Sequence, residues 1–441
     1  MLQVAKKQQL SIINLVPPSN RLQKHNTTNF RKLKMTKLSV AIKSALLAGV
    51  ALTATTVSAS DKDLLETLYQ NGVLNKAQFE KLSKQADEKE ATASLSPEMA
   101  KSLDWASRIK ISGDMRARFE SVDNEAKIKK NRQRIRARLA IEAKVNDEVK
   151  AGFRLVTSGG RTSTNSSLGK NDDGFHGDGV YFDRAFIHWT PEFASGASLT
   201  VGKFKMPWFR VTDNIWDSDV NPEGLALGYT SKVGPVKLTA VGGYYILSDN
   251  GDEGHTFSED LNMYHAGLSG AMKFNNAVKA SLGFNAFIFN ANDPVGVNKM
   301  AGDHTNGDLD ADFKIYEVAS KVDIKTGIVP IKIYGNYAVN AANDIKDHED
   351  TAWLVGVGTK WNSFKLDYNY RDTQKNAVTD TFNDSDFNRG GTGARGHKVK
   401  LAYSISKNFS IGGAYLAAQD YTQSAGHIDR DTFQLDLKAK F

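Results

Sequence analysis

Apolar and polar residues alternate strictly along the last eleven residues of the chain, DTFQLDLKAKF at 431–441. Apolar side chains occupy every second position from Phe433 to Phe441, and polar side chains occupy the positions between them. A repeat of two residues is typical of a β-strand with one apolar and one polar face. Because chain ends usually fray, a strand that keeps this pattern to its last residue is expected to pair on both sides.

The same alternation recurs from Trp105 to the end of the chain, in sixteen runs of strand length. It is clearest in RIRARLAIEAKV at 134–145, TAWLVGVGTKW at 351–361 and HKVKLAYSIS at 397–406. The pattern predicts an all-β domain. Its strands are expected to begin near residues 107, 132, 149, 180, 197, 223, 235, 262, 277, 312, 329, 351, 363, 396, 409 and 431.

The connections between these runs alternate in length. Short ones lie at 146–148, 191–196, 232–235, 275–276, 326–329, 362–363 and 407–408. Long polar loops are expected at 122–131, 158–179, 207–222, 248–261, 290–311, 340–350, 371–395 and 421–430. Barrels of the outer membrane have short periplasmic turns and longer extracellular loops. The alternation therefore predicts a transmembrane antiparallel β-barrel of about 16 strands, closed by pairing of 431–441 with 409–420 and with the first strand near 107–121.

Composition supports this fold class. Mean hydropathy is −0.42, and the sequence contains no run of 18 apolar residues, which excludes a helical membrane protein. A barrel stays compatible with low hydropathy, because half of each strand faces water. The absence of Cys excludes disulfides, thiol nucleophiles and Cys-based metal sites.

The first 59 residues differ from the rest in charge. They hold nine Lys and Arg residues and no Asp or Glu, which leaves 48 basic and 50 acidic residues elsewhere, a net charge of −2. The overall basicity is therefore no indication of nucleic-acid binding. Residues 35–59 have a basic start, a short apolar core and a Val-Ser-Ala site, which predicts a signal peptide cleaved after Ala59. Residues 1–34, upstream of Met35, are interpreted as an over-extended start, with a long transit peptide as the alternative.

Residues 60–103 are expected to form a helical segment and linker before a barrel at 104–441. Leu64, Leu65 and Leu68 have helical spacing, and Asn75 is suited to cap a second helix. We expect this short segment to lie in the periplasm. Binding to a partner, self-association and a solvated spacer are all compatible with its sequence.

From about Asp61 to Phe441 the sequence resembles outer-membrane porins of Gram-negative bacteria, in particular the putative porin family, which is related to phosphate-selective porins. The matching stretches are LLETLYQNGVLNKAQFEKL, RIKISGDMRARFE at 108–120, NRQRIRARLAIEAKV at 131–145, YFDRAFIHW at 181–189, VGKFKMPW at 201–208 and the terminal Phe441. The resemblance implies a location in the cell outer membrane, contact with its lipid and passive diffusion of small hydrophilic solutes. It also implies that Phe441 is the assembly signal for the barrel-assembly machinery. A homotrimer is one oligomeric state compatible with the resemblance.

Alternation assigns one face of each strand to the lumen. The basic residues expected to line the pore are Lys110, Arg116, Arg118, Arg134, Arg136, Arg138, Arg154 and Arg184. Guanidinium groups attract anions and bind phosphate or carboxylate through paired hydrogen bonds. Such a wall would favour anions or phosphate, as the resemblance also implies. The alternative is a structural network in which the arginines pair with Glu120, Glu142 and loop carboxylates.

The loop PWFRVTDNIWDSDVNPEG at 207–224 is the third long one. In sixteen-stranded porins the third loop folds inward and narrows the channel. The resemblance therefore implies a constriction loop in which Asp213, Asp217 and Asp219 oppose the arginine wall. Opposite charges across a narrow passage would create a transverse field that favours small polar solutes.

Other chemistry finds little support in the sequence. DLDAD at 308–312 has the spacing of a calcium loop but lacks its Gly and distal Glu, so we expect no metal site and no cofactor. An outer-membrane hydrolase would need a Ser–His–carboxylate set on the barrel rim, and we expect no enzyme. A plugged structural or adhesive barrel is the third class, and single-channel conductance separates it from an open channel.

Overall fold

The computed structural model describes residues 65–66, 68–71, 74–93, 105–125, 127–169, 175, 177–248, 260–290, 313–342, 349–422 and 426–441. The chain divides into two compact units, residues 1–101 and 102–441. The expected signal peptide at 35–59, the segment 1–34 and DLDAD at 308–312 lie outside the described residues.

The first unit contains helix α3 (Lys76–Ala93). Its start is a reciprocal cap: the Gln78 N–H donates to Asn75 Oδ1 over 2.9 Å, and the Asn75 N–H donates to Gln78 Oε1 over 3.1 Å. The Tyr69 ring stacks on Phe79 with 4.7 Å between centroids, which ties the preceding turn to the helix. Among the described residues, no helix is long and apolar enough to cross a membrane.

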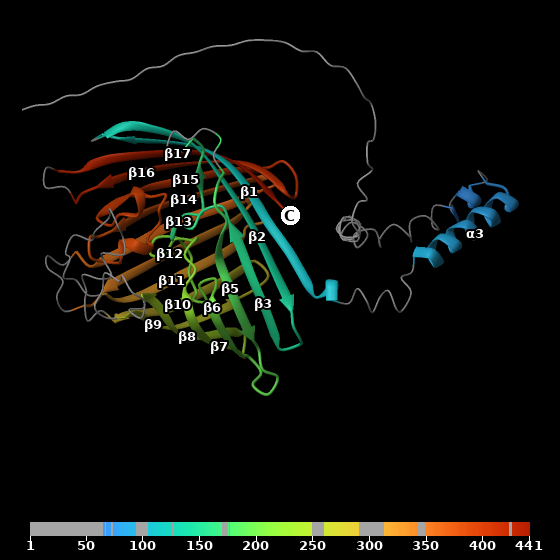
Figure 1. The fold of residues 1–441 in the computed structure, drawn as a ribbon, viewed down its shortest axis with the longest axis horizontal. Coiled ribbons are helices and arrows are strands. Elements are labelled where there is room, and N and C mark those ends of the chain that lie inside the picture. Colours follow the sequence, from blue (N-terminus) through green and yellow to red (C-terminus); the bar gives the residue numbers. More distant parts are fainter. Residues whose placement is uncertain are drawn as a thin grey trace, which may run out of the picture. The chain divides into compact units, whose positions relative to one another are not determined.

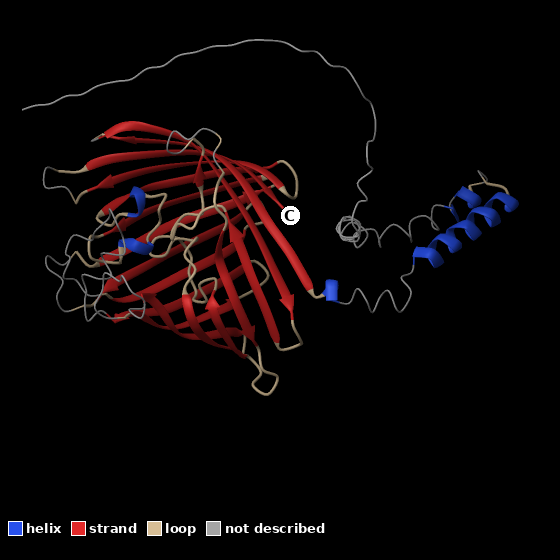
Figure 2. Ribbon diagram, viewed as in Figure 1, coloured by secondary structure: helices blue, strands red, loops and turns tan. Residues whose placement is uncertain are grey.

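The second unit is a closed antiparallel barrel (Figures 1 and 2). Its described strands are β1 (Ile109–Asn124), β2 (Lys127–Lys144), β3 (Val149–Val156), β4 (Ser166–Ser167), β5 (Tyr181–Trp189), β6 (Ala197–Lys203), β7 (Glu223–Val233), β8 (Val236–Ser248), β9 (Leu261–Lys273), β10 (Val278–Asn290), β11 (Lys314–Lys325), β12 (Pro330–Asn340), β13 (Thr351–Trp361), β14 (Phe364–Thr373), β15 (Ala394–Ser404), β16 (Phe409–Asp420) and β17 (Ile428–Lys440). Strand β4 is a two-residue addition to β2, and the other sixteen strands form the wall. The predicted fold class is confirmed.

Strand β17 closes the barrel, as the alternation predicted. Leu437 lies opposite Ile411 of β16 on one side and opposite Ala117 of β1 on the other. The Phe441 N–H donates to the Gly113 carbonyl over 3.1 Å, and the Gly113 N–H donates back over 2.9 Å. A Cβ at Gly113 would lie 2.4 Å from the Phe441 ring, so only glycine leaves room for the last side chain.

The prediction of a long loop at 122–131 is wrong. Strands β1 and β2 continue through this range, and only residues 125–126 separate them. Ile128 is 94% exposed, and Lys129 pairs with Asp123 over 3.0 Å on an exposed stretch of the hairpin. Both faces of the hairpin meet water here, so the backbone ladder continues without any alternation of apolar residues that a sequence pattern could detect.

The outer face of the barrel is apolar on all sides. Met115, Leu437 and Val357 occupy outward positions on β1, β17 and β13, and all are well exposed. Trp361 and Phe274 lie at short turns and are 56% and 61% exposed. Apolar side chains that face away from the lumen, with aromatic residues at the strand ends, are typical of a surface in contact with lipid.

Candidate functional site

The loop between β6 and β7, residues 204–222, folds into the barrel. Trp216 of this loop is buried, with its ring centroid 5.1 Å from Trp208, 5.1 Å from Phe287 of β10 and 5.3 Å from Phe382. The loop packs on the inner faces of strands β8 to β13. The buried side chains of this aromatic core are Phe204, Met206, Trp208, Ile215, Trp216, Val220, Ala226, Tyr245, Met263, Phe287, Phe289, Phe313, Ile315, Ala338, Ala352, Ala377, Val378 and Phe382.

A second loop, residues 374–393 between β14 and β15, also folds inward and contains the 3₁₀ helices η2 (Asp380–Phe382) and η3 (Asn388–Gly390). Residues 376–384 are all buried. A long polar loop was expected at 371–395, and the structure has one, but it is buried inside the barrel. Its Asp, Asn and Thr residues are typical of exposed loops, and only partners elsewhere in the chain allow these polar groups to be buried.

The two inward loops are bonded to each other. The Asp217 N–H donates to the Phe382 carbonyl over 2.7 Å, and the Ser385 N–H donates to the Asp217 carboxylate over 2.8 Å. Thr373, at the end of β14, donates its hydroxyl to Asn214 over 3.0 Å. These contacts make the two loops one structural unit inside the barrel.

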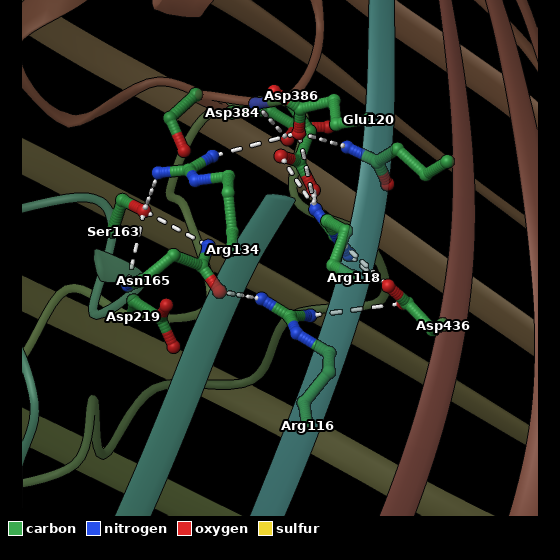
Figure 3. A network of polar contacts seen from close by, with 12 residues as sticks. Arg116, Arg118, Glu120, Arg134, Ser163, Asn165, Asp219, Asp384, Asp386 and Asp436 are labelled. Carbon is green, nitrogen blue, oxygen red and sulfur yellow. Dashed lines mark hydrogen bonds and ion pairs between the residues drawn. The ribbon is translucent and has the colours of Figure 1, made fainter. Parts of the chain in front are cut away.

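On the opposite side the lumen wall is charged, and most of its arginines have carboxylate partners (Figure 3). Arg118 of β1 donates to Asp436 of β17 over 2.6 Å and to Asp386 of the second loop over 3.2 Å. Its guanidinium also lies 3.6 Å from Glu120. Arg134 reaches Glu120 over 3.5 Å. Strands β1 and β17 are therefore joined to the second loop through a single buried arginine.

The arginines further along β2 share one carboxylate. Arg136 donates to Asp114 over 2.8 Å, and Arg138 donates to the other oxygen of the same group over 2.7 Å. Arg138 also reaches Asp219 of the first loop over 3.4 Å. Arg116 contacts Asn165 and lies 3.9 Å from Asp436. This part of the network bridges β1, β2 and the loop at 204–222.

The remaining predicted pore residues lie at the edges of this network. Arg154 donates to Asp183 over 2.8 Å, and Arg184 donates to Asn221 over 2.7 Å. Lys110 is exposed, opposite Glu142 on the lumen face near the short-turn end. The structure brings the predicted arginines together on β1, β2, β3 and β5.

The three predicted constriction carboxylates have different surroundings. Asp219 faces Arg138 and accepts a hydrogen bond from the Thr164 hydroxyl over 3.2 Å. Asp213 lies 3.2 Å from Arg210 of its own loop. Asp217 is buried at the junction of the two loops, and this burial, reinforced by the nearby Asp384 charge, raises its pKa well above the ordinary value. Of the three, Asp219 is the one bonded to the arginine wall.

Asp384 anchors the second loop on the charged side. Its carboxylate accepts from Arg371 over 2.9 Å and from Lys398 over 2.6 Å, and all three residues are at most 4% exposed. Burial alone would raise the pKa of Asp384, but the charges of Lys398 and Arg371 outweigh it and lower the pKa to about 2. The group is therefore a carboxylate at neutral pH.

Between the loops and the charged wall lies a cavity of about 440 Å³. Its basic lining residues are Arg116, Arg118, Arg136, Lys332, Lys365, Arg371, Lys398, Lys400 and Lys438, and its acidic ones are Asp213, Asp217, Asp219, Asp367, Asp384, Asp386 and Asp436. Sequence reasoning did not select the lysines of β12, β14, β15 and β17. The alternation in 363–370 and 397–406 would have placed Lys365 and Lys400 on the lumen face.

The lining also indicates which ligands the cavity suits. Its polar groups are mostly ammonium, guanidinium and carboxylate, with side-chain amide and hydroxyl groups beside them. In the part of the chain that the structure describes, no group of three or more His, Asp or Glu residues is arranged to hold a metal ion. The site is therefore suited to hydrated polar or charged solutes.

Comparison with known proteins agrees with the barrel. The profile of the putative porin family matches residues 122–367 and 309–441. The high-pH structure of Pseudomonas putida OprB aligns with a TM-score of 0.52 at 11% identity, covering 78% of this chain and 96% of that one. Salmonella typhi OmpF, solved in complex with daunomycin, aligns with a TM-score of 0.47 at 13% identity, covering 76% and 97%. No curated protein sequence matches the chain.

The family match spans well over half of the sequence, and the OprB alignment independently shows the barrel fold. The resemblance expected from the sequence is thereby confirmed. The chain belongs to the putative porin family, whose barrels lie in the outer membrane.

Proposed function

We propose that the protein forms a water-filled passage through the outer membrane for small hydrophilic solutes, with a preference for anions. The cavity of about 440 Å³ between the two loops and the charged wall carries this proposal. Nine basic and seven acidic side chains line it, so the fixed charge around the solute is positive. Fixed charges in a narrow passage raise the local concentration of counter-ions.

The lysines of the cavity are better placed than the arginines to attract a passing anion. Arg118, Arg136 and Arg138 already bind carboxylates of the wall, which offset much of their charge. Among the described residues, Lys365 and Lys400 form no ion pair, and both are exposed to the lumen. The predicted arginine wall then supplies a positive background and holds the loops, while the two lysines supply ammonium groups that no carboxylate binds directly among the described residues.

The test is the reversal potential of single channels in a KCl gradient. A double Lys365→Gln and Lys400→Gln variant is expected to shift it toward cation preference, and more strongly at low salt, where the Debye length is about 30 Å at 0.01 M. Lys407→Gln, in the exposed turn between β15 and β16, is the matched control. The anion preference would be contradicted if the double variant and the control both had the reversal potential of the natural protein.

A plugged structural or adhesive barrel is the second candidate, because the aromatic core and two inward loops occupy one side of the lumen. Such a barrel would insert into planar bilayers without regular current steps. Discrete, voltage-independent steps would instead support the passage. An esterase assay on the purified barrel addresses the hydrolase alternative, which would require turnover that depends on a Ser and a His of the rim.

We also propose that Phe441 is recognised by the barrel-assembly machinery and that the segment at 60–103 lies in the periplasm. Phe441 is 61% exposed on the outer face, and its backbone completes the β17–β1 ladder. Deletion of Phe441 is expected to lower the amount of barrel in the outer membrane. Cross-linking of outer-membrane material would show whether the barrels associate as homotrimers.

A further inference from the structure

A second cavity, of about 220 Å³, lies at the end of the barrel that carries the long loops. Its lining comes from the ends of strands β5 to β9 and from residues 158–161 and 219–222 of two loops. Asp219 lines both this cavity and the larger one of about 440 Å³. A molecule bound in the smaller cavity would therefore lie next to the larger one without occupying it.

The inner end of the smaller cavity is apolar. Trp216, Tyr245, Met263 and Phe382 line it, and each of these residues is at most 5% exposed. The rings of Trp216 and Phe382 are stacked, with 5.3 Å between their centroids and 25° between their planes. Because removal of apolar surface from water is favourable, this end is suited to a hydrocarbon group.

The mouth of the cavity is charged and open to water. The Lys203 ammonium group donates to Glu223 over 2.7 Å, and the two side chains are 37% and 59% exposed. Arg161 is exposed, and its guanidinium group is attracted by the same Glu223. One carboxylate therefore faces two cations, and the mouth keeps a net positive charge.

The other two carboxylates of the lining are held by arginines outside it. Asp183 accepts from Arg154 over 2.8 Å, and Asp219 lies 3.4 Å from Arg138. Their charges are therefore offset without the groups at the mouth. The cavity combines an apolar inner end with a positively charged mouth, which is the polarity that an amphipathic acid requires.

The volume limits the size of such a ligand. An apolar protein cavity of about 150 Å³ holds benzene, a ring of six carbons. In proportion, the cavity of about 220 Å³ accommodates roughly eight or nine carbons. This estimate favours a medium-length chain over the longer acyl chains of membrane lipids.

We propose that this cavity binds an amphipathic monocarboxylate of about eight carbons, with octanoate as the representative ligand. The hydrocarbon chain lies against Trp216 and Phe382, and the carboxylate accepts hydrogen bonds from Arg161 at the mouth. Guanidinium groups bind carboxylates through paired hydrogen bonds. The site differs in chemistry from the larger cavity, whose lining is mostly charged.

The test is equilibrium dialysis of radiolabelled octanoate against the full barrel in phosphatidylcholine nanodiscs, with empty discs as the background. Discs replace detergent because the single chain of a detergent would compete for the cavity. We expect saturable binding of about one octanoate per barrel. The measurement needs no current, so failure of the proposed passage and failure of this site are distinguishable.

Two changes alter the volume of the cavity in opposite directions. Val220→Phe fills it and is expected to weaken octanoate binding about tenfold or more. Val357→Phe, the same change on the outer face, is the matched control. Met263→Ala enlarges the inner end and should move the preference from octanoate to an acid of about ten carbons. Loss of the fold cannot produce this gain.

Arg161→Gln tests the role of the charged mouth. It is expected to weaken octanoate binding about two- to fivefold, as for an exposed ion pair, and to leave the binding of 1-octanol unchanged. Arg395→Gln, an exposed residue outside the cavity, is the control. An equal loss of 1-octanol binding would overturn the assignment of the carboxylate to Arg161.

Octanoate binding that does not exceed that of empty discs would overturn the proposal. Binding that Val220→Phe leaves unchanged would also overturn it, because the acid would then lie elsewhere on the barrel. The proposal is supported if binding is lost in Val220→Phe, kept in Val357→Phe and moved to the longer acid in Met263→Ala. Heat-modifiable migration of each variant shows that the barrel is folded.

Discussion

The two sides of the lumen wall are built from different interactions. The inner faces of strands β8 to β13 carry aromatic and aliphatic side chains, which pack against the inward loops. The inner faces of β1, β2, β14, β15 and β17 carry arginines, lysines and carboxylates joined in a buried network. The same two loops, at 204–222 and 374–393, contact both sides.

The aromatic side and the charged side of the lumen wall therefore have different roles. Apolar packing is non-directional and scales with buried area, so the aromatic side sets how firmly the loops are held. Buried ion pairs add little net stability but are costly to break, because one partner is then left charged and unpaired. The charged side therefore determines where the loops sit and which solutes the remaining space accepts.

The largest expected effect is on the aromatic side. Trp216→Ala removes a buried ring that contacts Trp208, Phe287 and Phe382. Loss of such a side chain from a packed core costs about 3–5 kcal/mol. We expect the free energy of unfolding to fall by this amount and single-channel conductance to rise as the loops loosen.

The control for this change is Trp361→Ala, which removes an outward ring that is 56% exposed at a short turn. It should change conductance little. A Trp216→Ala barrel with unchanged conductance and unchanged thermal transition would show that the aromatic side does not hold the loops.

The second effect is on the charged side. Asp384→Asn leaves Arg371 and Lys398 buried without their shared carboxylate. We expect a loss of about 3 kcal/mol, the lower end for a broken buried pair, because the adjacent cavity admits water. Limited proteolysis should then cut within 374–393, where burial of the loop is expected to protect the natural barrel. The matched control is Asp123→Asn, which breaks an exposed pair with Lys129 and should cost under about 1 kcal/mol.

The same carboxylate predicts a pH dependence. The pKa of Asp384 is about 2 in the folded protein, below its ordinary value of 3.8, so its stabilising effect is present above about pH 4. It is lost as the pH falls from 4 toward 2. Protease resistance of the second loop should decline over that range in the natural barrel. Asp384→Asn should abolish this step, and persistence of the step in the variant would assign it to another group.

A third prediction concerns the outer face, where the two sides should not differ. Leu437 is on the outer face of the charged side, and Val357 is on the outer face of the aromatic side. Each is replaced by arginine in turn. An arginine on the lipid face costs about 2–4 kcal/mol at the midplane and less near the interface. We expect similar losses of heat-modifiable barrel for both variants. Normal assembly of either one would contradict its outward assignment.

The smallest expected effect is on selectivity alone. A triple Arg116→Gln, Arg134→Gln and Arg136→Gln variant should shift the anion-to-cation permeability ratio about twofold toward cations, because carboxylates already offset these charges. Reversal potentials at low salt measure it. Arg395→Gln, an exposed residue bonded to Gln419, is the control. A shift larger than that of the Lys365→Gln and Lys400→Gln variant would show that the arginines contribute more to anion preference than the two lysines do.

Much of the barrel could be predicted from the sequence because the relevant pattern is local. Alternation across 431–441 and 351–361 requires only that one face of a strand meets lipid and the other meets the lumen. The prediction failed at 122–131, where both faces of the hairpin meet water and the pattern disappears.

The ion-pair partners and the burial of the loops inside the lumen could be determined only from the tertiary structure. The alternation placed Arg118 and Arg136 on the inner face, but only the fold shows that Asp436 and Asp114 bind them. The segment 374–393 has the composition of a solvated loop, and it is buried because Asp217, 168 residues away, accepts from Ser385. Strand periodicity follows from neighbouring residues, whereas burial of a polar loop depends on partners from distant parts of the chain that meet only when the barrel closes.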